Sequence, residues 1–571
     1  MQKNFLIFDN TKIIILLTFL LFVVHYRTAV HENIILIRKY VMELYVILAV
    51  LGLLMLASLL SSKLSSLINM PCLLLFLAVG LLWGSDTVTS FITTTPLIPD
   101  AQSAQMTKGV SPVFANYLGS IALAFILFSG GFDTDWKSIK SVFRTGELLS
   151  TMGVLLSAIF TGLAAWGMFS FTNSDLQFSL SWCLLLGAII SSTDAAAVFS
   201  ILRSKSVSLK GKLQPLLEFE SGSNDPMAAF LTVFFLSIVT MEMTKGQSPM
   251  LMDYLMVIPS FLMDMTVGIL LGAAFGALFV WIYNRIDFDY NGLYYVLAVI
   301  AVLLTYSVTC LCKGNGFMAV YVTGIFMGNS KFVFHNGVGR FYDGLAWMMQ
   351  VILFTMLGRL ANAAEVWNAK WYGLAVAFIL MVIARPLAVF ICMWKSPFSI
   401  RERLLVSWVG LRGGAPIMLA TFPLLALSGT EETQMLFNIV FFIVITSVLF
   451  QGMTIMPLAK LLKLDAPLKK RVRMPLSFEE TGDSSSDSRE ILVPAEKNGQ
   501  TLARLKLPEG ALVLMIRRDE KFIVPRGDTS LAEGDILTIM GTPSAVSACE
   551  DFLSDSGKKE EKPEKNTEIR K

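Results

Sequence analysis

Charged residues are scarce in this chain. Asp, Glu, Lys and Arg make up only 16% of its 571 residues, whereas 54% are hydrophobic. A soluble domain usually carries about 25% charged residues, so this composition excludes an ordinary soluble protein and indicates a polytopic membrane protein. The formal net charge is only +3, and no basic stretch is interleaved with aromatic residues. We therefore expect a lipid bilayer as the surrounding medium and no nucleic acid as partner.

Histidine and cysteine are also sparse. The three histidines are His25, His31 and His335, so we expect any proton chemistry to use other side chains. The six cysteines are scattered, and the C-x-C pair Cys310 and Cys312 lies in an apolar segment, where packing is a more frequent explanation than a metal site. There is no G-x-x-x-x-G-K-[ST] loop, which disfavours an ATP-driven pump. We expect no cofactor, and no metal beyond a transported ion.

Long apolar runs dominate what is present. A helix needs about 20 apolar residues to cross the ~30 Å hydrocarbon core. Thirteen segments fit, with short connections that indicate one compact bundle. They are 43–61, 69–84, 113–132, 146–172, 178–203, 213–240, 257–284, 290–311, 316–334, 342–362, 372–395, 402–427 and 433–462. The expected fold is thus an all-α polytopic membrane protein over residues 43–464.

The distribution of Lys and Arg predicts the orientation of these spans. If the basic segment after the last span is cytoplasmic, the loops on that side hold fourteen Lys and Arg residues and the opposite loops hold four. The positive-inside rule then places the N-terminus of the first span outside and the C-terminus in the cytoplasm.

Residues 1–42 do not fit this scheme. The apolar run 13–24 is shorter than a comfortable span and is similar to the core of a signal peptide, although no small-residue cleavage site follows. As a further span it would place basic residues outside. The alternative that translation starts at Met42 is slightly favoured.

The composition changes after the last span. Residues 465–490 are polar and predict a linker. Short β-type runs at 512–517, 522–524 and 536–540, separated by turn signals, predict a small cytoplasmic α/β domain over residues 491–555. Residues 556–571 form a charged tail that we expect to be disordered. A domain of this kind below a bundle is more often a regulator or dimeriser than a catalyst.

Ionisable groups inside predicted spans are costly and are functional candidates. Glu220, Ser221, Asn224 and Asp225 lie in "ESGSNDP", and at 100° per residue they occupy two neighbouring faces of one helix. Pro226 cannot donate to the carbonyl of Gly222, which is then free to meet an ion. The remaining candidates are Thr193, Asp194, Arg385 and Arg412. The pattern favours a structural role, in capping or pairing, for Asp194, Glu220, Arg385 and Arg412.

Asp225 is different because a lone buried carboxylate must be protonated or ligated. Such a group can exchange a proton for a cation, and Asn224 and Ser221 are neutral oxygen donors beside it. With no second acid adjacent, one carboxylate alternates one H⁺ with one monovalent ion. The Gly-rich segment at 412–416 and the polar segment at 193–194 each lie in the fifth span of one half of the chain, if 257–284 links the halves. Paired interrupted helices predict a transporter site at an inverted-repeat interface.

The motifs "SSTDAAAVFSILR", "ESGSNDP", "GLRGGAP" and "LAFILFSGGFDTDW" closely resemble the cation:proton antiporter 1 family, the NhaP-type sodium or potassium/proton antiporters. This resemblance implies thirteen helices in inverted repeats, two crossed broken helices and a homodimer. By motif position it implies that Asp225 binds the ion and the proton with Asn224 beside it, and that Thr193 and Ser221 are ligands. It further implies that Asp194 stabilises the crossed breaks, that Glu220 pairs with Arg385, and that Arg412 serves the second break.

The C-terminal segment resembles the TrkA-C (RCK-C) regulatory domain, without a Gly-rich dinucleotide-binding half before it. Together the two resemblances imply a potassium/proton exchanger of the bacterial inner membrane, with K⁺ favoured over Na⁺ and a small nucleotide as a hypothetical ligand of the C-terminal domain. Two other classes stay open from the residues: a cation channel gated by the cytoplasmic domain, and an intramembrane aspartyl protease built on Asp194 and Asp225. The channel lacks a filter-like T-V-G-Y-G loop, and the protease lacks a Gly-x-Gly-Asp setting. The leading prediction is antiport, and not enzyme catalysis.

Overall fold

The computed structural model describes residues 52–53, 55–60, 71–84, 111–171, 178–204, 207–245, 250–427, 430–467, 487–505, 507–518 and 521–554. The chain divides into two units, each of which is described by itself. One unit holds most of the helical bundle. The other holds the C-terminal domain together with the segments Leu278–Leu297 and Ser330–Arg340.

The first half of the bundle consists of helices that follow the predicted spans. They are α2 (Cys72–Trp83), α5 (Pro112–Phe132), α6 (Trp136–Lys140), α7 (Phe143–Leu148), the π-helical turn η1 (Leu149–Gly153), α8 (Val154–Phe171), α9 (Leu180–Ile189), α10 (Ala195–Ser204) and α11 (Leu213–Lys245).

Helices α12 (Leu251–Leu255) and α13 (Val257–Arg285) connect this half to the second. The second half consists of α14 (Gly292–Leu311), α15 (Gly316–Gly328), α16 (His335–Leu360), α17 (Ala363–Asn368), α18 (Lys370–Phe378), the π-helical turn η2 (Ile379–Ala384), α19 (Arg385–Cys392), α20 (Ile400–Trp408), α21 (Gly414–Leu419), α22 (Thr421–Ala426) and α23 (Glu431–Leu461).

Every predicted span from 69–84 onward coincides with a helix or an interrupted helix. Within the described residues, eight helices are long and apolar enough to cross a membrane, and four shorter apolar helices accompany them. The first predicted span, 43–61, lies mostly outside the described residues, as does the segment before it. The all-α membrane fold is therefore confirmed.

Several helix starts follow from local sequence. Ser399 and Glu402 form a capping box at α20, in which the Ser399 N–H donates to Glu402 Oε2 at 2.7 Å and the Glu402 N–H donates to Ser399 Oγ at 3.4 Å. Pro112 stands at the start of α5, where its missing N–H costs nothing. These signals place helix ends without help from tertiary contacts.

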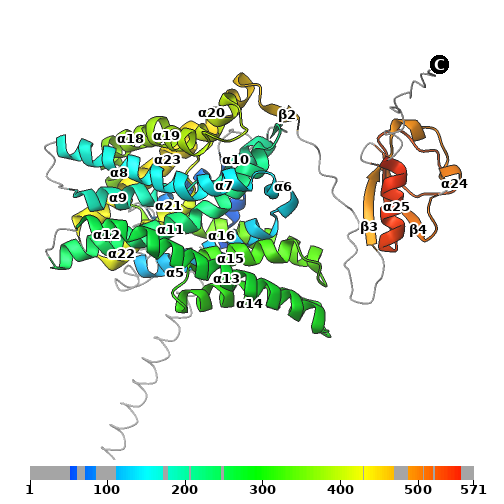
Figure 1. Cartoon of the computed structure of the whole chain (residues 1–571), viewed down its shortest axis with the longest axis horizontal. Coiled ribbons are helices and arrows are strands. Elements are labelled where there is room, and N and C mark those ends of the chain that lie inside the picture. Colours follow the sequence, from blue (N-terminus) through cyan, green and yellow to red (C-terminus); the bar gives the residue numbers. More distant parts are fainter. Residues whose placement is uncertain are drawn as a thin grey trace, which may run out of the picture. The chain divides into compact units, whose positions relative to one another are not determined.

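The two halves correspond in their fourth and fifth spans. The fourth span of each half contains a π-helical turn, η1 in the first and η2 in the second, and the fifth span of each is interrupted. Turn η1 contacts α19 and turn η2 contacts α8, so the fourth spans pair reciprocally. In Figure 1, α8 runs beside α19, which lies far from it in sequence. This reciprocity is the arrangement expected of an inverted repeat.

A short two-stranded sheet ties the segment after the last span to the loop before α11. Strand β1 (Val207–Leu209) pairs antiparallel with β2 (Asp465–Pro467), with Ser208 opposite Ala466. The Lys210 N–H donates to the Leu464 carbonyl at 2.9 Å, and Lys210 Nζ donates to the Lys463 carbonyl at 3.0 Å. Strand β1 lies in a predicted loop and β2 in the predicted linker, and neither strand was predicted. A strand of three residues is too short to show a periodic pattern in the sequence.

The C-terminal domain is a four-stranded antiparallel sheet with one long helix. Its elements are β3 (Asp487–Leu492), a 3₁₀ turn η3 (Ala495–Lys497), α24 (Leu502–Leu505), β4 (Ala511–Arg518), β5 (Lys521–Ile523), β6 (Ile536–Gly541) and α25 (Pro543–Ser554), with strand order β3-β6-β4-β5. The three predicted strands correspond to β4, β5 and β6. Strand β3 begins at Asp487, before the predicted boundary at 491 and within the predicted linker.

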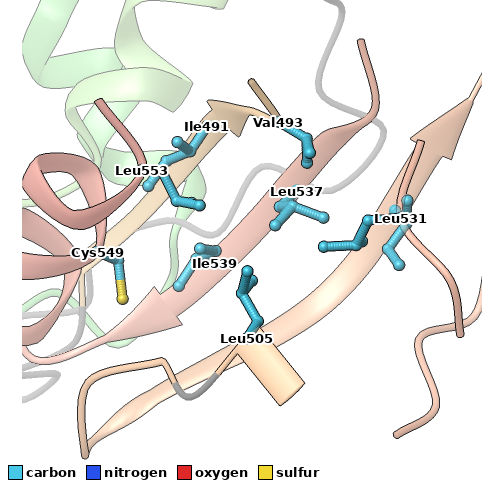
Figure 2. Packing of buried hydrophobic residues seen from close by; sticks show 9 residues of the cluster. Ile491, Val493, Leu505, Leu531, Leu537, Ile539, Cys549 and Leu553 are labelled. Atoms are coloured by element: carbon cyan, nitrogen blue, oxygen red, sulfur yellow. The ribbon is translucent and has the colours of Figure 1, made fainter. Parts of the chain in front are cut away.

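This domain has a hydrophobic core of its own. Ile491, Leu537 and Ile539 from the sheet face Cys549 and Leu553 of α25, with Val493, Leu505, Ile516 and Leu531 completing the cluster (Figure 2). Leu537 and Ile539 are alternate residues of the central strand β6, so they enter this core from one face of the sheet. Residues 556–571 lie outside the described part of the chain.

Candidate ion-binding site

The two interrupted spans cross at their breaks. Helix α9 ends at Ile189 and α10 begins at Ala195, while α20 ends at Trp408 and α21 begins at Gly414. The Asp194 N–H donates to the Leu411 carbonyl at 2.7 Å, so the two non-helical segments touch through their backbones. Such segments at membrane depth require protein partners for their polar groups, because hydrocarbon offers none.

Arg412 supplies partners at the end of α9. Its Nη1 donates to the Ser191 and Ser192 carbonyls, each at 2.6 Å, and the guanidinium is almost fully buried. The C-terminal end of a helix carries a partial negative charge and unpaired carbonyls. Arg412 therefore compensates both the orphaned carbonyls and the dipole of the half-helix.

Asp194 supplies a negative charge at the N-terminal ends of two helices, whereas Arg412 supplies a positive charge at a C-terminal end. Its Oδ1 accepts a hydrogen bond from the Ala197 N–H at 3.0 Å, capping α10. Its Oδ2 lies so close to Gly413 that a Cβ added there would be only 2.2 Å away. One carboxylate thus faces the positive, N-terminal ends of α10 and α21 together. The predicted helix-supporting roles of Asp194 and Arg412 correspond to these contacts.

Helix α23 completes the support of the second break. Ser447 Oγ accepts from the Arg412 N–H at 3.1 Å and donates to Gln451 Oε1 at 2.6 Å. Gln451 Nε2 in turn donates to the Trp408 carbonyl at 2.9 Å, at the end of α20. These two residues were not predicted, although polar side chains one helical turn apart in an apolar span are the signal that indicates them.

Helix α11 brings the central polar group to the first break. Ser192 Oγ donates to Asp225 Oδ1 at 2.6 Å, and Asn224 Nδ2 donates to Thr193 Oγ1 at 2.5 Å. Ser221 Oγ donates to the Thr193 carbonyl at 2.8 Å. Thr193 and Asp194 therefore lie beside Ser221, Asn224 and Asp225, as the family resemblance implied. Ser192 was not among the predicted ligands, yet it is the residue that contacts the carboxylate.

The remaining oxygen atoms define what this cluster can bind. Asn224 is fully buried, and its Oδ1 has no hydrogen-bond partner among the described residues. A buried amide oxygen without a donor is costly unless a ligand occupies the position. With the Asp225 carboxylate adjacent in sequence, the donor set consists of hard oxygen atoms, which suit a partly dehydrated monovalent cation.

Glu220 and Arg385 form a buried ion pair beside this cluster, through Glu220 Oε1 and Arg385 Nη2. Both side chains are at most 2% exposed. Arg385 lies over Gly410, where an added Cβ would be 3.2 Å from its Nε. The predicted pair is present, and it joins α11 to α19 and to the second break.

Pro226 lies inside α11, which continues through it from Leu213 to Lys245. Its missing N–H removes the helical donor to the Gly222 carbonyl, as the sequence indicated. Cys310 lies in the last turn of α14, where a Cβ added to Gly316 would be 2.6 Å from its Sγ, and Cys312 follows the end of that helix at Leu311. Within the described residues, no group of three His, Cys, Asp or Glu side chains is placed to hold a metal.

Comparisons with known proteins agree with this geometry. The model of the sodium/hydrogen exchanger transmembrane family matches residues 46–461, and that of the TrkA-C domain matches residues 489–554. The K(+)/H(+) antiporter NhaP2 of Shewanella sp. (strain ANA-3) is 34% identical over 518 residues, covering 89% of this chain and 83% of the relative. The K(+)/H(+) antiporter NhaP of Alkalimonas amylolytica is 38% identical over 421 residues, covering 73% and 67% respectively.

A solved structure shares the fold. The sodium proton antiporter MjNhaP1 from Methanocaldococcus jannaschii, determined at pH 8, aligns with a TM-score of 0.58 at 22% identity, covering 75% of this chain and all of the other. The channel and protease alternatives find no support among these matches. The chain belongs to the sodium/hydrogen exchanger family of cation:proton antiporters and carries a TrkA-C domain at its C-terminal end.

Proposed function

We propose that this protein exchanges cytoplasmic K⁺, or Na⁺, for external H⁺ by alternating access, with the two substrates competing for Asp225. The observation that carries the proposal is the cluster at the first break. There the Asp225 carboxylate meets Ser192, and the buried Asn224 Oδ1 has no partner among the described residues. Thr193 and Ser221 supply further oxygen atoms to the same cluster.

The charges around the cluster support an electroneutral cycle. Glu220 is paired with Arg385, Arg412 is engaged by helix carbonyls, and Asp194 caps α10. These groups have fixed electrostatic partners, whereas within the described residues Asp225 accepts a hydrogen bond only from a neutral hydroxyl, that of Ser192. Asp225 is then the group that alternates between H⁺ and M⁺, one charge for one charge.

Selectivity for K⁺ is favoured by the relatives. The two named above are K(+)/H(+) antiporters at 34% and 38% identity, whereas the Na(+)/H(+) antiporter NhaH of Halobacillus aidingensis is 26% identical over 413 residues. We further propose that the protein is a homodimer of the bacterial inner membrane with its C-terminal domain in the cytoplasm. The excess of Lys and Arg in the loops on that side supports this orientation.

The test is ion exchange in proteoliposomes. An imposed pH gradient is followed after adding K⁺, Na⁺ or Li⁺, across a pH series and with the membrane voltage clamped or free. We expect the wild type to dissipate the gradient with K⁺, independently of voltage, and Asp225→Asn to lose exchange. Asp289→Asn, which removes an exposed acid between α13 and α14, is the matched control and should behave as wild type. Exchange by Asp225→Asn at the wild-type rate would contradict the assignment.

The C-terminal domain is proposed to regulate this exchange through a small ligand such as a nucleotide. The β1–β2 sheet supports a physical route, because the segment leading to that domain is hydrogen-bonded to the loop that precedes α11. We expect deletion of residues 486–571, which leaves β2 in place, to retain exchange and to remove its response to nucleotides. Loss of all exchange in a correctly assembled deletion variant would argue against a purely regulatory domain.

A further inference from the structure

Helix α15 is joined closely to two neighbours through glycines. A Cβ added to Gly131 of α5 would lie 2.4 Å from the Tyr321 carbonyl oxygen, and one added to Gly324 of α15 would lie 2.4 Å from the Phe128 carbonyl oxygen. On another side, a Cβ added to Gly272 of α13 would lie 2.5 Å from the Ala319 carbonyl oxygen. Because backbones touch without intervening side chains, α5, α13 and α15 pack as one rigid layer.

Helix α11 contacts this layer through the rings of Phe230 and Phe261, whose centroids lie 5.4 Å apart, and at two points nearer to Asp225. The first is Gly222, where an added Cβ would lie 2.6 Å from the Tyr321 hydroxyl oxygen. The second is Pro226, whose carbonyl accepts a hydrogen bond from Asn315 Nδ2 at 2.9 Å. The first contact is a van der Waals contact between a glycine and an aromatic ring, and the second is a directional hydrogen bond.

Asn315 is held so that its amide must point toward α11. Its Oδ1 accepts from the Met318 N–H at 3.0 Å and caps α15, and its own N–H donates to the Asp264 carbonyl of α13 at 3.0 Å. With the acceptor and the backbone fixed by the rigid layer, only the NH₂ group is left to reach Pro226. That carbonyl belongs to the residue immediately after Asp225.

Alternating access in inverted-repeat transporters moves one group of helices against another around the bound ion. We propose that Asn315 is a latch on the external side of the ion site, whose hydrogen bond to the Pro226 carbonyl is made in this conformation and broken when α11 moves toward the outward-open state. The proposal rests on the proposed antiport and on the orientation given above, in which α11 runs from the cytoplasmic to the external side. Asn315 is a positioning residue and does not contact the ion.

A latch predicts an effect with a direction. Removing one hydrogen bond from one of two states shifts their ratio about fivefold. The outward-open state then gains population, so the half-saturating concentration of external K⁺ falls and that of cytoplasmic K⁺ rises. A residue needed only for folding would instead change activity equally from both faces.

The experiment compares Asn315→Ser with the wild type in membrane vesicles of both orientations. Serine retains an oxygen that caps α15 but is too short to reach Pro226. Asn362→Ser is the matched control, because Asn362 also caps a helix, α17, by accepting from the Ala364 N–H at 3.0 Å. The half-saturating K⁺ concentration is measured from each face for all three proteins.

We expect an asymmetric shift in Asn315→Ser, with external affinity raised and cytoplasmic affinity lowered, and no asymmetry in Asn362→Ser. Equal shifts from both faces, the opposite asymmetry, or wild-type values would overturn the latch. If Asn315→Ser does not assemble, the half-saturating K⁺ concentrations are measured for Asn315→Asp instead, at high ionic strength. Aspartate keeps the oxygen that caps α15 and lacks the NH₂ donor. Absence of exchange in the wild type would instead refute the proposed antiport itself.

Discussion

At the scale of single residues, the site consists of polar groups that serve as hydrogen-bond partners for one another at membrane depth. The carbonyls left free by the end of α9 meet Arg412, and the Thr193 carbonyl meets the Ser221 hydroxyl. The Leu411 carbonyl meets the Asp194 N–H. Since unpaired backbone groups are costly where water is excluded, these contacts stabilise the crossing. In the proposed mechanism they leave Asp225 as the group that changes its charge.

Ser192 provides the first test at this scale. Ser192→Ala removes the hydroxyl that donates to Asp225, and a hydrogen bond to a charged group contributes about 1.5–3 kcal/mol. We expect the half-saturating cation concentration to rise roughly tenfold. Ser191→Ala is the control, because the Ser191 hydroxyl donates instead to the Ala188 carbonyl at 2.6 Å. Ion-dependent proton exchange in proteoliposomes measures both, and equal effects would show that Ser192 has no special role.

At the scale of elements, the inverted repeat explains why two unrelated stretches of sequence form one site. Each half contributes a span with a π-helical turn followed by an interrupted span, and the interruptions cross. A helix broken in one half has its orphaned ends satisfied partly by groups from the other half, such as Arg412 for α9. Neither interrupted helix is therefore expected to be stable in the membrane without its counterpart.

Gly413 tests this interdependence. Gly413→Ala places a Cβ 2.2 Å from Asp194 Oδ2, so the carboxylate must leave the two helix starts or the segments must separate. We expect a loss of at least about 2 kcal/mol of stability, together with loss of exchange. Thermal unfolding of the purified protein measures the first and vesicle assays the second. Gly130→Ala, with nothing within 4 Å of the added Cβ, should leave both unchanged.

At the scale of the whole molecule, two units of different chemistry share one chain. The bundle places its ionisable groups in pairs or caps inside an apolar body, whereas the C-terminal domain has a soluble-type core of alternating strand residues and one helix. Their stabilities accordingly respond to different conditions. The C-terminal domain has its own acid-sensitive element in Asp535 and Arg518.

Asp535 is 1% exposed at its side chain and binds Arg518 through two hydrogen bonds of 2.9 and 2.7 Å. Burial acts to raise the pKa of Asp535, but the Arg518 guanidinium and the Ala532 N–H outweigh it and lower that pKa below its ordinary value. A lowered pKa in the folded state contributes stability above the unfolded-state pKa, and that stability is lost as pH falls through the folded-state pKa.

We expect Asp535→Asn to destabilise the domain by about 2–3 kcal/mol at neutral pH, because it leaves Arg518 without its counter-charge. The wild type should approach the variant only in strong acid. Arg489→Gln is the control: its ion pair with Glu550 is exposed, with side chains 44% and 50% exposed, so its loss should cost little. Hydrogen exchange of β4 and β6 is measured in the full-length wild type and in both variants. Equal protection in Asp535→Asn and the wild type would contradict this account.

Much of the structure of this protein is determined by local sequence and could therefore be predicted from it. The lengths of the apolar runs predicted the spans from 69–84 onward, because the thickness of the hydrocarbon core allows few alternatives. The helical rotation of 100° per residue placed Ser221, Asn224 and Asp225 on adjoining faces of α11. The pairing of Glu220 with Arg385 came from the family resemblance rather than from spacing.

What only the tertiary structure decided are the contacts between segments that no periodicity relates. Ser192 rather than Thr193 touches Asp225, Asn315 reaches Pro226 from a distant helix, and β2 pairs with β1 although Val207 and its partner Pro467 are far apart in the sequence. Pro226, which by itself removes one helical hydrogen bond, leaves α11 uninterrupted from Leu213 to Lys245. Local chemistry sets which groups must find partners, and the packing of the two halves decides which partners they find.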